Sequence, residues 1–135
     1  MEPLRVAVIG RTGRGDWGHA IDELWRDIAA AEIVAVADES EEGLGKAVAR
    51  LKLDAAKPGV AHRDWRRMLA EVKPDIVAIC MRHVDCHAEM AIAAAEAGAV
   101  LPVSLLRAGA VVEVALAPRA GWGGRGVLGC RLRPV

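Results

Sequence analysis

Four residues near the amino terminus have the types and spacing of a site that binds a dinucleotide. Gly13, Gly15 and Gly18 form the pattern Gly-x-Gly-x-x-Gly just after the apolar run 6–9 and Gly10. Asp38 ends a second apolar run about 20 positions beyond Gly18, which is the spacing of the dinucleotide fingerprint. We therefore expect the glycine segment to bind a pyrophosphate and Asp38 to accept hydrogen bonds from a ribose.

Each of these residue types suits dinucleotide binding for a physical reason. Glycine adopts positive φ and, without a Cβ, lets main-chain N–H groups approach a phosphate closely. At the start of a helix, unpaired N–H groups and the helix dipole both favour an anion. In the alternative interpretation, Gly13 and Gly15 only form a flexible loop and Asp38 only caps the next helix.

These residues need a strand before the glycines, a helix after them and a second strand before the acid. Residues 4–9 are predicted to form a buried strand, and residues 33–37 the second strand. Residues 20–31 predict an amphipathic helix, with Ile21, Leu24, Trp25 and Ile28 on one face. Further along we predict a helix at 41–51, a strand at 60–62, a helix capped by Asp64 and extending to 71, a strand at 76–80 and a helix at 85–97.

This alternation of strands and helices predicts an α/β fold, a Rossmann-type doubly wound parallel sheet with helices on both faces. The 135 residues suit a single domain, and 53% of them are hydrophobic. Lysine plus arginine equals aspartate plus glutamate at 18 each, so the net charge favours neither nucleic acid nor a membrane surface. We expect a small-molecule partner. The sequence leaves open whether the protein also associates with a second copy of itself or with another chain.

The other residue types predict no metal site and no disulfide framework. Cys80, Cys86 and Cys130 are odd in number and lack metal-type pairing, so we interpret them as free thiols in a reducing compartment. His19, His62, His83 and His87 lack an obvious ligand grouping, although His83 and His87 are four positions apart. No apolar run approaches the ~20 residues of a membrane span, and we expect a cytoplasmic protein.

The composition changes after Val100. Residues 101–135 hold five arginines, one acid, six glycines and no lysine. We therefore expect two parts, a dinucleotide-binding domain at 1–100 and a divergent, irregular tail at 101–135. Segments 101–106 and 111–116 can form strands, and 121–126 is typical of a flexible loop.

Residues 4–100 resemble the N-terminal nucleotide-binding domain of the glucose-fructose oxidoreductase, inositol dehydrogenase and MocA-like family. The segments that carry the resemblance are 8–19, 35–38, 68–77 and 87–98. It implies that this part binds NAD or NADP and that a larger α+β domain follows, which holds a sugar, polyol or related substrate.

The resemblance also implies roles for individual residues. Met81 and Arg82 fall in the loop that passes the nicotinamide in relatives, although Arg82 can equally be a solvated loop residue. His87 matches a position where relatives usually have histidine, and a structural role at the helix start is an equal alternative. The residues assigned to the cofactor are Gly10, Gly13, Arg14, Gly15 and Gly18 near the pyrophosphate, Asp38 at the ribose, and Met81, Arg82 and His87.

One departure from the family concerns the chemistry. Relatives have a Glu-Lys-Pro tripeptide whose lysine lies beside the substrate hydroxyl, whereas residues 99–104 here contain neither glutamate nor lysine. No lysine follows Lys73, so we assign no catalytic residue. Truncation or a frame change near Val100 would explain the tail, and a shortened natural protein is the alternative.

Three functional hypotheses remain. The first is the NAD(P)-binding domain of an oxidoreductase of the sugar or polyol dehydrogenase type, inactive alone. The second is a stand-alone NAD(H)-binding regulatory or interaction module, and the third is a degenerate fragment that binds nothing. Asp38 and Glu39 disfavour a 2′-phosphate by like charge, which favours NAD over NADP, although Arg11 and Arg14 can reverse that preference.

Overall fold

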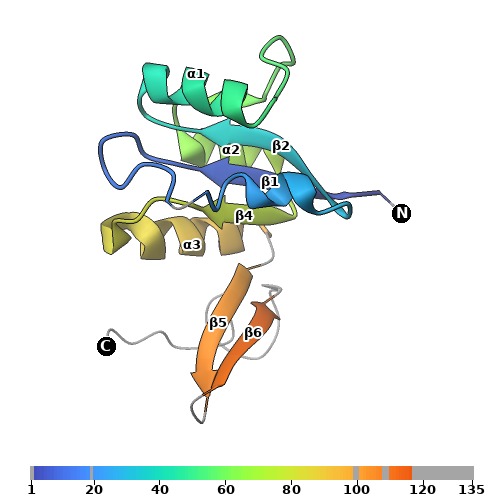
Figure 1. Cartoon of the computed structure of the whole chain (residues 1–135), viewed down its shortest axis with the longest axis vertical. Helices are drawn as coiled ribbons and strands as arrows, with labels where there is room; N and C mark the ends of the chain where they lie inside the picture. Colours follow the sequence, from blue (N-terminus) through green and yellow to red (C-terminus); the bar gives the residue numbers. More distant parts are fainter. Residues whose placement is uncertain (1, 19, 99–100, 108–109, 117–135) are drawn as a thin grey trace.

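A parallel sheet forms the centre of the fold (Figure 1). The computed structural model describes residues 2–18, 20–98, 101–107 and 110–116. Its four-stranded sheet has the order β3-β2-β1-β4. The strands are β1 (Leu4–Ile9), β2 (Ala31–Ala37), β3 (Ala61–His62) and β4 (Ile76–Ile79). The predicted Rossmann-type arrangement is confirmed, with β1 between β2 and β4.

Strand β1 is buried on both faces because helices and a loop cover the sheet on both sides. Val8 pairs in parallel with Val36 of β2 and with Ala78 of β4. Since alternate side chains of a strand point to opposite faces, Val8 and Ile9 enter different clusters. Both are almost completely buried.

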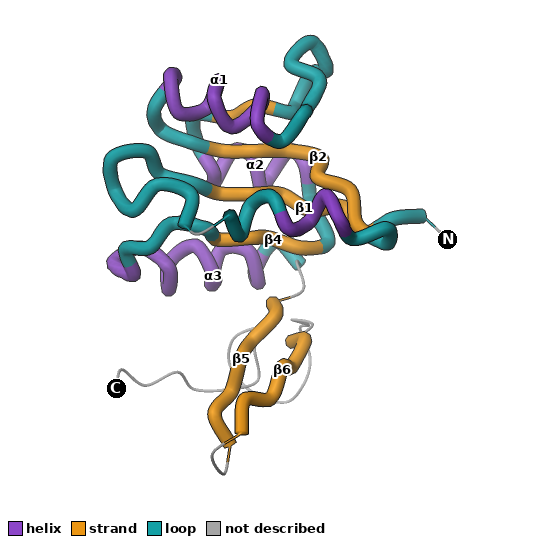
Figure 2. The backbone as a smooth tube through the Cα atoms, in the orientation of Figure 1, coloured by secondary structure: helices purple, strands orange, loops and turns teal. Residues whose placement is uncertain are grey.

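Three α-helices follow strands as predicted (Figure 2). Helix α1 (Glu41–Arg50) begins after Ser40, whose Oγ accepts a hydrogen bond from Gly43 N at 3.1 Å. Helix α2 (Trp65–Val72) is capped by Asp64. Helix α3 (His87–Glu96) begins two residues later than expected, after the 3₁₀ turn η2 (Val84–Cys86). Side chains of α2 and α3 pack on one face of the sheet, and those of α1 on the other.

The predicted helix at 20–31 is wrong. The segment contains only a short 3₁₀ helix, η1 (Leu24–Asp27), and Ala20 has a φ of +59°, which interrupts any α-helix there. The apolar residues that defined the expected buried face are partly exposed instead. Ile21 is 43% exposed, Leu24 44% and Ile28 39%.

A buried ion pair accounts for this departure. Asp22, which the helical pattern placed on the polar face, is 1% exposed and receives hydrogen bonds from Arg50 Nε at 2.9 Å and Nη2 at 2.5 Å. The Arg50 guanidinium carbon also lies 5.2 Å from the centre of the Trp17 ring, and Trp17 packs in the same cluster as Val8. Tertiary contacts of Asp22 and Trp17 therefore cover the face of the sheet where a helix was expected.

Strand β1 has the predicted bounds, and the bounds of the other strands differ from the predictions by one or two residues. β2 begins at Ala31 rather than 33, because Ala31 already pairs with Leu4 of β1. Strands β5 (Leu101–Arg107) and β6 (Ala110–Leu116) form an antiparallel pair. The segment 121–126 lies outside the described residues, and the division at residue 100 stays a prediction. In the part of the chain that the structure describes, no helix is long and apolar enough to cross a membrane.

The ion pair gives a prediction about stability. Replacing Arg50 by methionine leaves the buried Asp22 carboxylate without its cation, and we expect a loss of about 3 kcal/mol in the free energy of unfolding. Adding Asp22→Leu should recover most of this loss, because both charges are then gone. Urea unfolding of the single and double variants tests this, and a double variant no more stable than Arg50→Met would contradict it.

Candidate functional site

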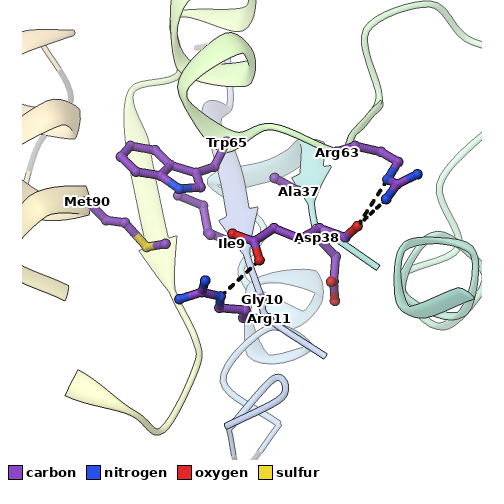
Figure 3. Close-up of a pocket in the computed structure, with 9 residues that line it drawn as sticks. Ile9, Gly10, Arg11, Ala37, Asp38, Arg63, Trp65 and Met90 are labelled. Atoms are coloured by element: carbon purple, nitrogen blue, oxygen red, sulfur yellow. Dashed lines mark hydrogen bonds and ion pairs between the residues drawn. The ribbon is translucent and has the colours of Figure 1, made fainter. Parts of the chain in front are cut away.

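A shallow pocket lies at the carboxyl ends of β1 and β2 (Figure 3). In open α/β sheets, ligands bind outside the carboxyl ends of the strands. It is a surface depression with no enclosed space large enough for a water molecule. Its lining residues are Ile9, Gly10, Arg11, Ala37, Asp38, Glu39, Arg63, Trp65 and Met90.

Asp38 faces the glycine-containing loop, as its place in the fingerprint predicts. It is 2% exposed, and its carboxylate accepts hydrogen bonds from three donors. Thr12 Oγ1 donates to Oδ2 at 2.6 Å, Thr12 N donates to Oδ2 at 3.0 Å, and Ser40 N donates to Oδ1 at 2.8 Å. The folded chain therefore satisfies this buried carboxylate with donors from two loops.

The glycine-containing loop is a tight turn rather than the start of a helix. Arg11 N donates to Asp16 O at 3.1 Å, and Asp16 N donates back to Arg11 O at 3.0 Å. Within the turn, Gly13 N donates to Asp16 Oδ1 at 2.9 Å and Arg14 N to Arg11 O at 3.0 Å. The expected helix N-terminus after the glycines is absent from this segment, because residues 20–23 are not helical. The amides of Gly13 and Arg14 are thus already engaged.

The four glycines serve two different purposes. A Cβ at Gly10 would overlap the Trp17 ring, and one at Gly18 would overlap the backbone oxygen of Cys80. At Gly15, which has a φ of +89°, it would lie 2.7 Å from the backbone nitrogen of Arg82. These three glycines let the loop pack closely on the sheet and on the segment after β4. Gly13, with a φ of +80°, has no atom within 4 Å of such a Cβ and faces open space.

Arginine side chains around the pocket are paired with acids or carbonyls. Arg11 Nε lies 3.1 Å from Glu39 Oε2, and this hydrogen bond and charge raise the pKa of Arg11. Arg63 donates to the backbone oxygen of Glu39 from Nε at 3.0 Å and from Nη2 at 2.6 Å (Figure 3). The two guanidinium groups therefore hold the chain just after Asp38 in place.

Two further arginines lie where the glycine loop meets the segment after β4. Arg14 forms an ion pair with Asp85. Desolvation opposes ionisation of Asp85, but the charge and hydrogen bond of Arg14 outweigh it and lower the pKa of Asp85. Arg82 Nη2 lies 3.9 Å from Asp16 Oδ2, and Arg82 N donates to Gly15 O at 3.2 Å. The two loops are tied to each other by charge and by backbone contact.

The side chains of Met81 and His87 are less exposed than their assignment to a cofactor suggested. The Met81 side chain is buried in the same core cluster as Trp65 and Met90. His87 is half-buried, and its Nε2 lies 2.7 Å from Met81 O, so it fixes the loop before α3. This contact matches the structural alternative for His87 and leaves contact with a cofactor untested.

The sequence analysis missed two contributors to this site. Thr12 was one of the loop residues between glycines, yet both its amide and its hydroxyl bind Asp38. Arg63, which lines the pocket beside Asp38, follows β3 and was not singled out. The signal that could have found Arg63 is its position at the carboxyl end of the strand next to β2, since those ends share one edge of the sheet.

The glycines provide a matched pair of variants. Gly13→Ala and Gly15→Ala both place a side chain at positive φ, which costs about 1–2 kcal/mol. Only Gly15→Ala also drives a Cβ against backbone, so it should lose at least about 1 kcal/mol more in the free energy of unfolding. Urea denaturation compares the two, and equal losses would show that the loop does not pack on the segment after β4.

Cys80 should be chemically inert in the folded chain. Burial, and next the charge of Asp22, raise the pKa of the Cys80 thiol to about 12, so it stays protonated at pH 8. In a Cys86→Ser/Cys130→Ser variant we expect iodoacetamide to alkylate Cys80 only after unfolding by urea. Mass spectrometry measures the modification, and rapid labelling of the native protein at pH 8 would contradict the buried placement.

Comparisons with known proteins identify the family. A model of the oxidoreductase family with an NAD-binding Rossmann fold matches residues 4–103. A probable dehydrogenase from Thermotoga maritima is 28% identical, with a TM-score of 0.57 over 71% of this chain and 26% of its own. No match was found among curated proteins.

Two other solved structures share the fold and contain nicotinamide cofactors. An Agrobacterium radiobacter oxidoreductase in complex with NAD+, L-tartaric acid and magnesium is 22% identical, with a TM-score of 0.57 over 71% of this chain and 25% of its own. Biliverdin reductase from Synechocystis sp. PCC 6803, in complex with biliverdin and NADP+, is 23% identical, with a TM-score of 0.53 over 72% and 28%. The chain thus spans about a quarter of the length of these proteins. It belongs to the glucose-fructose oxidoreductase, inositol dehydrogenase and MocA family of oxidoreductases, whose NAD-binding domain has a Rossmann fold.

Proposed function

We propose that this chain binds a nicotinamide dinucleotide with the adenosine half at the pocket beside Asp38. The observation that most directly supports this proposal is the buried Asp38 carboxylate, which lies at the end of β2 against the glycine loop. A carboxylate offers about four lone-pair positions, enough for the hydroxyls of a ribose in addition to backbone donors. Arg63 and Trp65 border the same pocket, beside the position proposed for the ribose.

The charges beside Asp38 support NAD rather than NADP. Asp38 and Glu39 are adjacent acids at the pocket, and a 2′-phosphate placed there would meet like charge. Arg11 and Arg63 are the cations at the pocket, and both are engaged by Glu39, Arg11 through its carboxylate and Arg63 through its backbone oxygen. NADP would therefore have to compete with Glu39 for either guanidinium.

The remaining residues of the proposed site are assigned to the pyrophosphate and the nicotinamide. Arg14 and Arg82 come from two loops in contact and can each exchange an acid for a phosphate. Gly13 faces open space and can admit the pyrophosphate. Met81 and His87 support the loop before α3 through their mutual hydrogen bond. The full proposed set is Gly10, Gly13, Arg14, Gly15, Gly18, Asp38, Met81, Arg82 and His87.

Within the family, we assign the chain to the cofactor-binding part of an oxidoreductase of the sugar or polyol dehydrogenase type. Hydride transfer needs the substrate carbon held at the nicotinamide and a group that takes the hydroxyl proton. The chain has four lysines, Lys46, Lys52, Lys57 and Lys73, and none of them lines the pocket. The chain therefore offers no lysine at the site, and we expect it to bind cofactor without turning over a polyol alone.

Asp38→Ala tests this function. Loss of hydrogen bonds to a charged group should weaken NADH binding by about 1–3 kcal/mol, or roughly 5-fold to 150-fold. Titration with NADH, followed by energy transfer from tryptophan to the nicotinamide, measures the Kd. The matched control is Glu42→Ala, which removes an exposed carboxylate on α1 and should leave the Kd unchanged.

Three outcomes test the functional hypotheses. Saturable NADH binding without turnover of a polyol supports the proposal and is shared by the stand-alone NAD(H)-binding module. Turnover of the polyol by the chain alone would show that the proton acceptor lies elsewhere in the chain. Absence of saturation with both NADH and NADPH would favour the degenerate, non-binding alternative.

A further inference from the structure

The strongest contact of the Asp38 carboxylate is with a side chain of the glycine loop. Thr12 Oγ1 donates to Asp38 Oδ2 at 2.6 Å, which is the length of a charge-assisted O–H···O bond. The other two donors to Asp38 are backbone amides, those of Thr12 and Ser40. Among the described residues, Thr12 is the only side chain that donates to this carboxylate.

The Thr12 hydroxyl packs against Gly43, where any side chain would collide with it. A Cβ at Gly43, in the first turn of α1, would overlap Thr12 Oγ1 and lie 2.8 Å from Asp38 Oδ2. The hydroxyl therefore fits between the carboxylate and the start of α1 because position 43 carries no side chain. This side of the carboxylate faces the start of α1, the helix that follows β2.

A ribose hydroxyl has the same chemistry as the Thr12 hydroxyl. Each is an aliphatic O–H that donates one hydrogen bond to a carboxylate at about 2.5–2.7 Å. The amides of Thr12 and Ser40 already use part of the capacity of Asp38. A ribose and the Thr12 hydroxyl would thus compete for the strongest position on Oδ2.

We propose that the Thr12 hydroxyl occupies, in the ligand-free chain, the position on Asp38 that a ribose hydroxyl takes when the dinucleotide binds. This inference rests on the proposed function. Binding then requires Thr12 to leave Asp38, with the loop moving around Gly13, which faces open space. The other half of the loop stays in place, because Gly15 packs against the backbone of Arg82.

The arrangement has a physical rationale. A buried carboxylate without donors is costly, so the ligand-free chain gains stability from the Thr12 hydroxyl. The same contact must be given up on binding, and it therefore lowers the affinity. Stability of the ligand-free form and affinity for the dinucleotide should change in opposite directions when Thr12 is altered.

Thr12→Val tests the inference, because it removes the hydroxyl and keeps the branched shape and the backbone amide. We expect the Kd for NADH to fall about 10-fold, equivalent to about 1.4 kcal/mol. Thr12→Ser keeps the hydroxyl and should leave the Kd within about twofold. The melting temperature of ligand-free Thr12→Val should be lower than that of the wild type. Thr12→Ala provides a second variant without the hydroxyl.

Two controls assign the effect to the ribose contact. In an Asp38→Asn background, Thr12→Val should no longer tighten binding. With AMP as the ligand the gain should persist, and with 2′,3′-dideoxy-AMP it should disappear, because that ligand has no ribose hydroxyls to take the vacated position. Isothermal titration calorimetry measures all of these affinities.

The outcomes separate the two proposals. If the wild type binds NADH and both Thr12→Val and Thr12→Ala bind equally or more weakly, this inference is overturned while the proposed function stands. If neither the wild type nor the variants bind any of the nucleotides, the proposed function fails and this inference fails with it. Tighter binding by Thr12→Val that survives with the dideoxy nucleotide would also overturn the inference.

Discussion

The position of the candidate site depends on how residues 10–30 are held against the sheet. This segment is almost without helix, so its backbone has no regular hydrogen-bond ladder of its own. The buried pair of Asp22 and Arg50, together with the Trp17 ring over Gly10, fixes it to α1 and to the end of β1. Because the loop from Arg11 to Asp16 lies within this anchored segment, its approach to Asp38 follows from the same contacts.

Local patterns were sufficient to predict most of the sheet and three helices. The apolar runs of β1, β2 and β4 are buried on both faces, and that burial is visible in sequence as uninterrupted hydrophobic character. Asp64 before α2 acts through hydrogen bonds to residues two and three positions away, so it too can be identified without tertiary information. These elements are encoded by interactions within the segment or by burial alone.

The segment at 20–31 shows where prediction from local sequence patterns fails. Its apolar spacing fits a helix, but its fold is decided by Asp22, whose partner Arg50 is far away in the sequence. The same holds at the site. Asp38 was found because the dinucleotide fingerprint encodes it, whereas the bond from Thr12 to Asp38 depends on a turn closed between Arg11 and Asp16 and on the missing side chain at Gly43. No spacing rule contains these contacts.

The two ends of the candidate site differ in how far they are preorganised for a ligand. At the ribose end, the buried carboxylate of Asp38 has a fixed orientation, and the Ser40 amide that contributes to it lies outside the loop that must move. At the pyrophosphate end, the amides of Gly13 and Arg14 are used within the turn, and the arginines are paired with acids. In the proposed complex, the adenosine half meets a carboxylate that is already oriented, whereas the phosphates exchange existing hydrogen bonds for new ones. The proposal therefore makes the affinity depend on the cost of opening the loop as well as on the contacts that the cofactor makes.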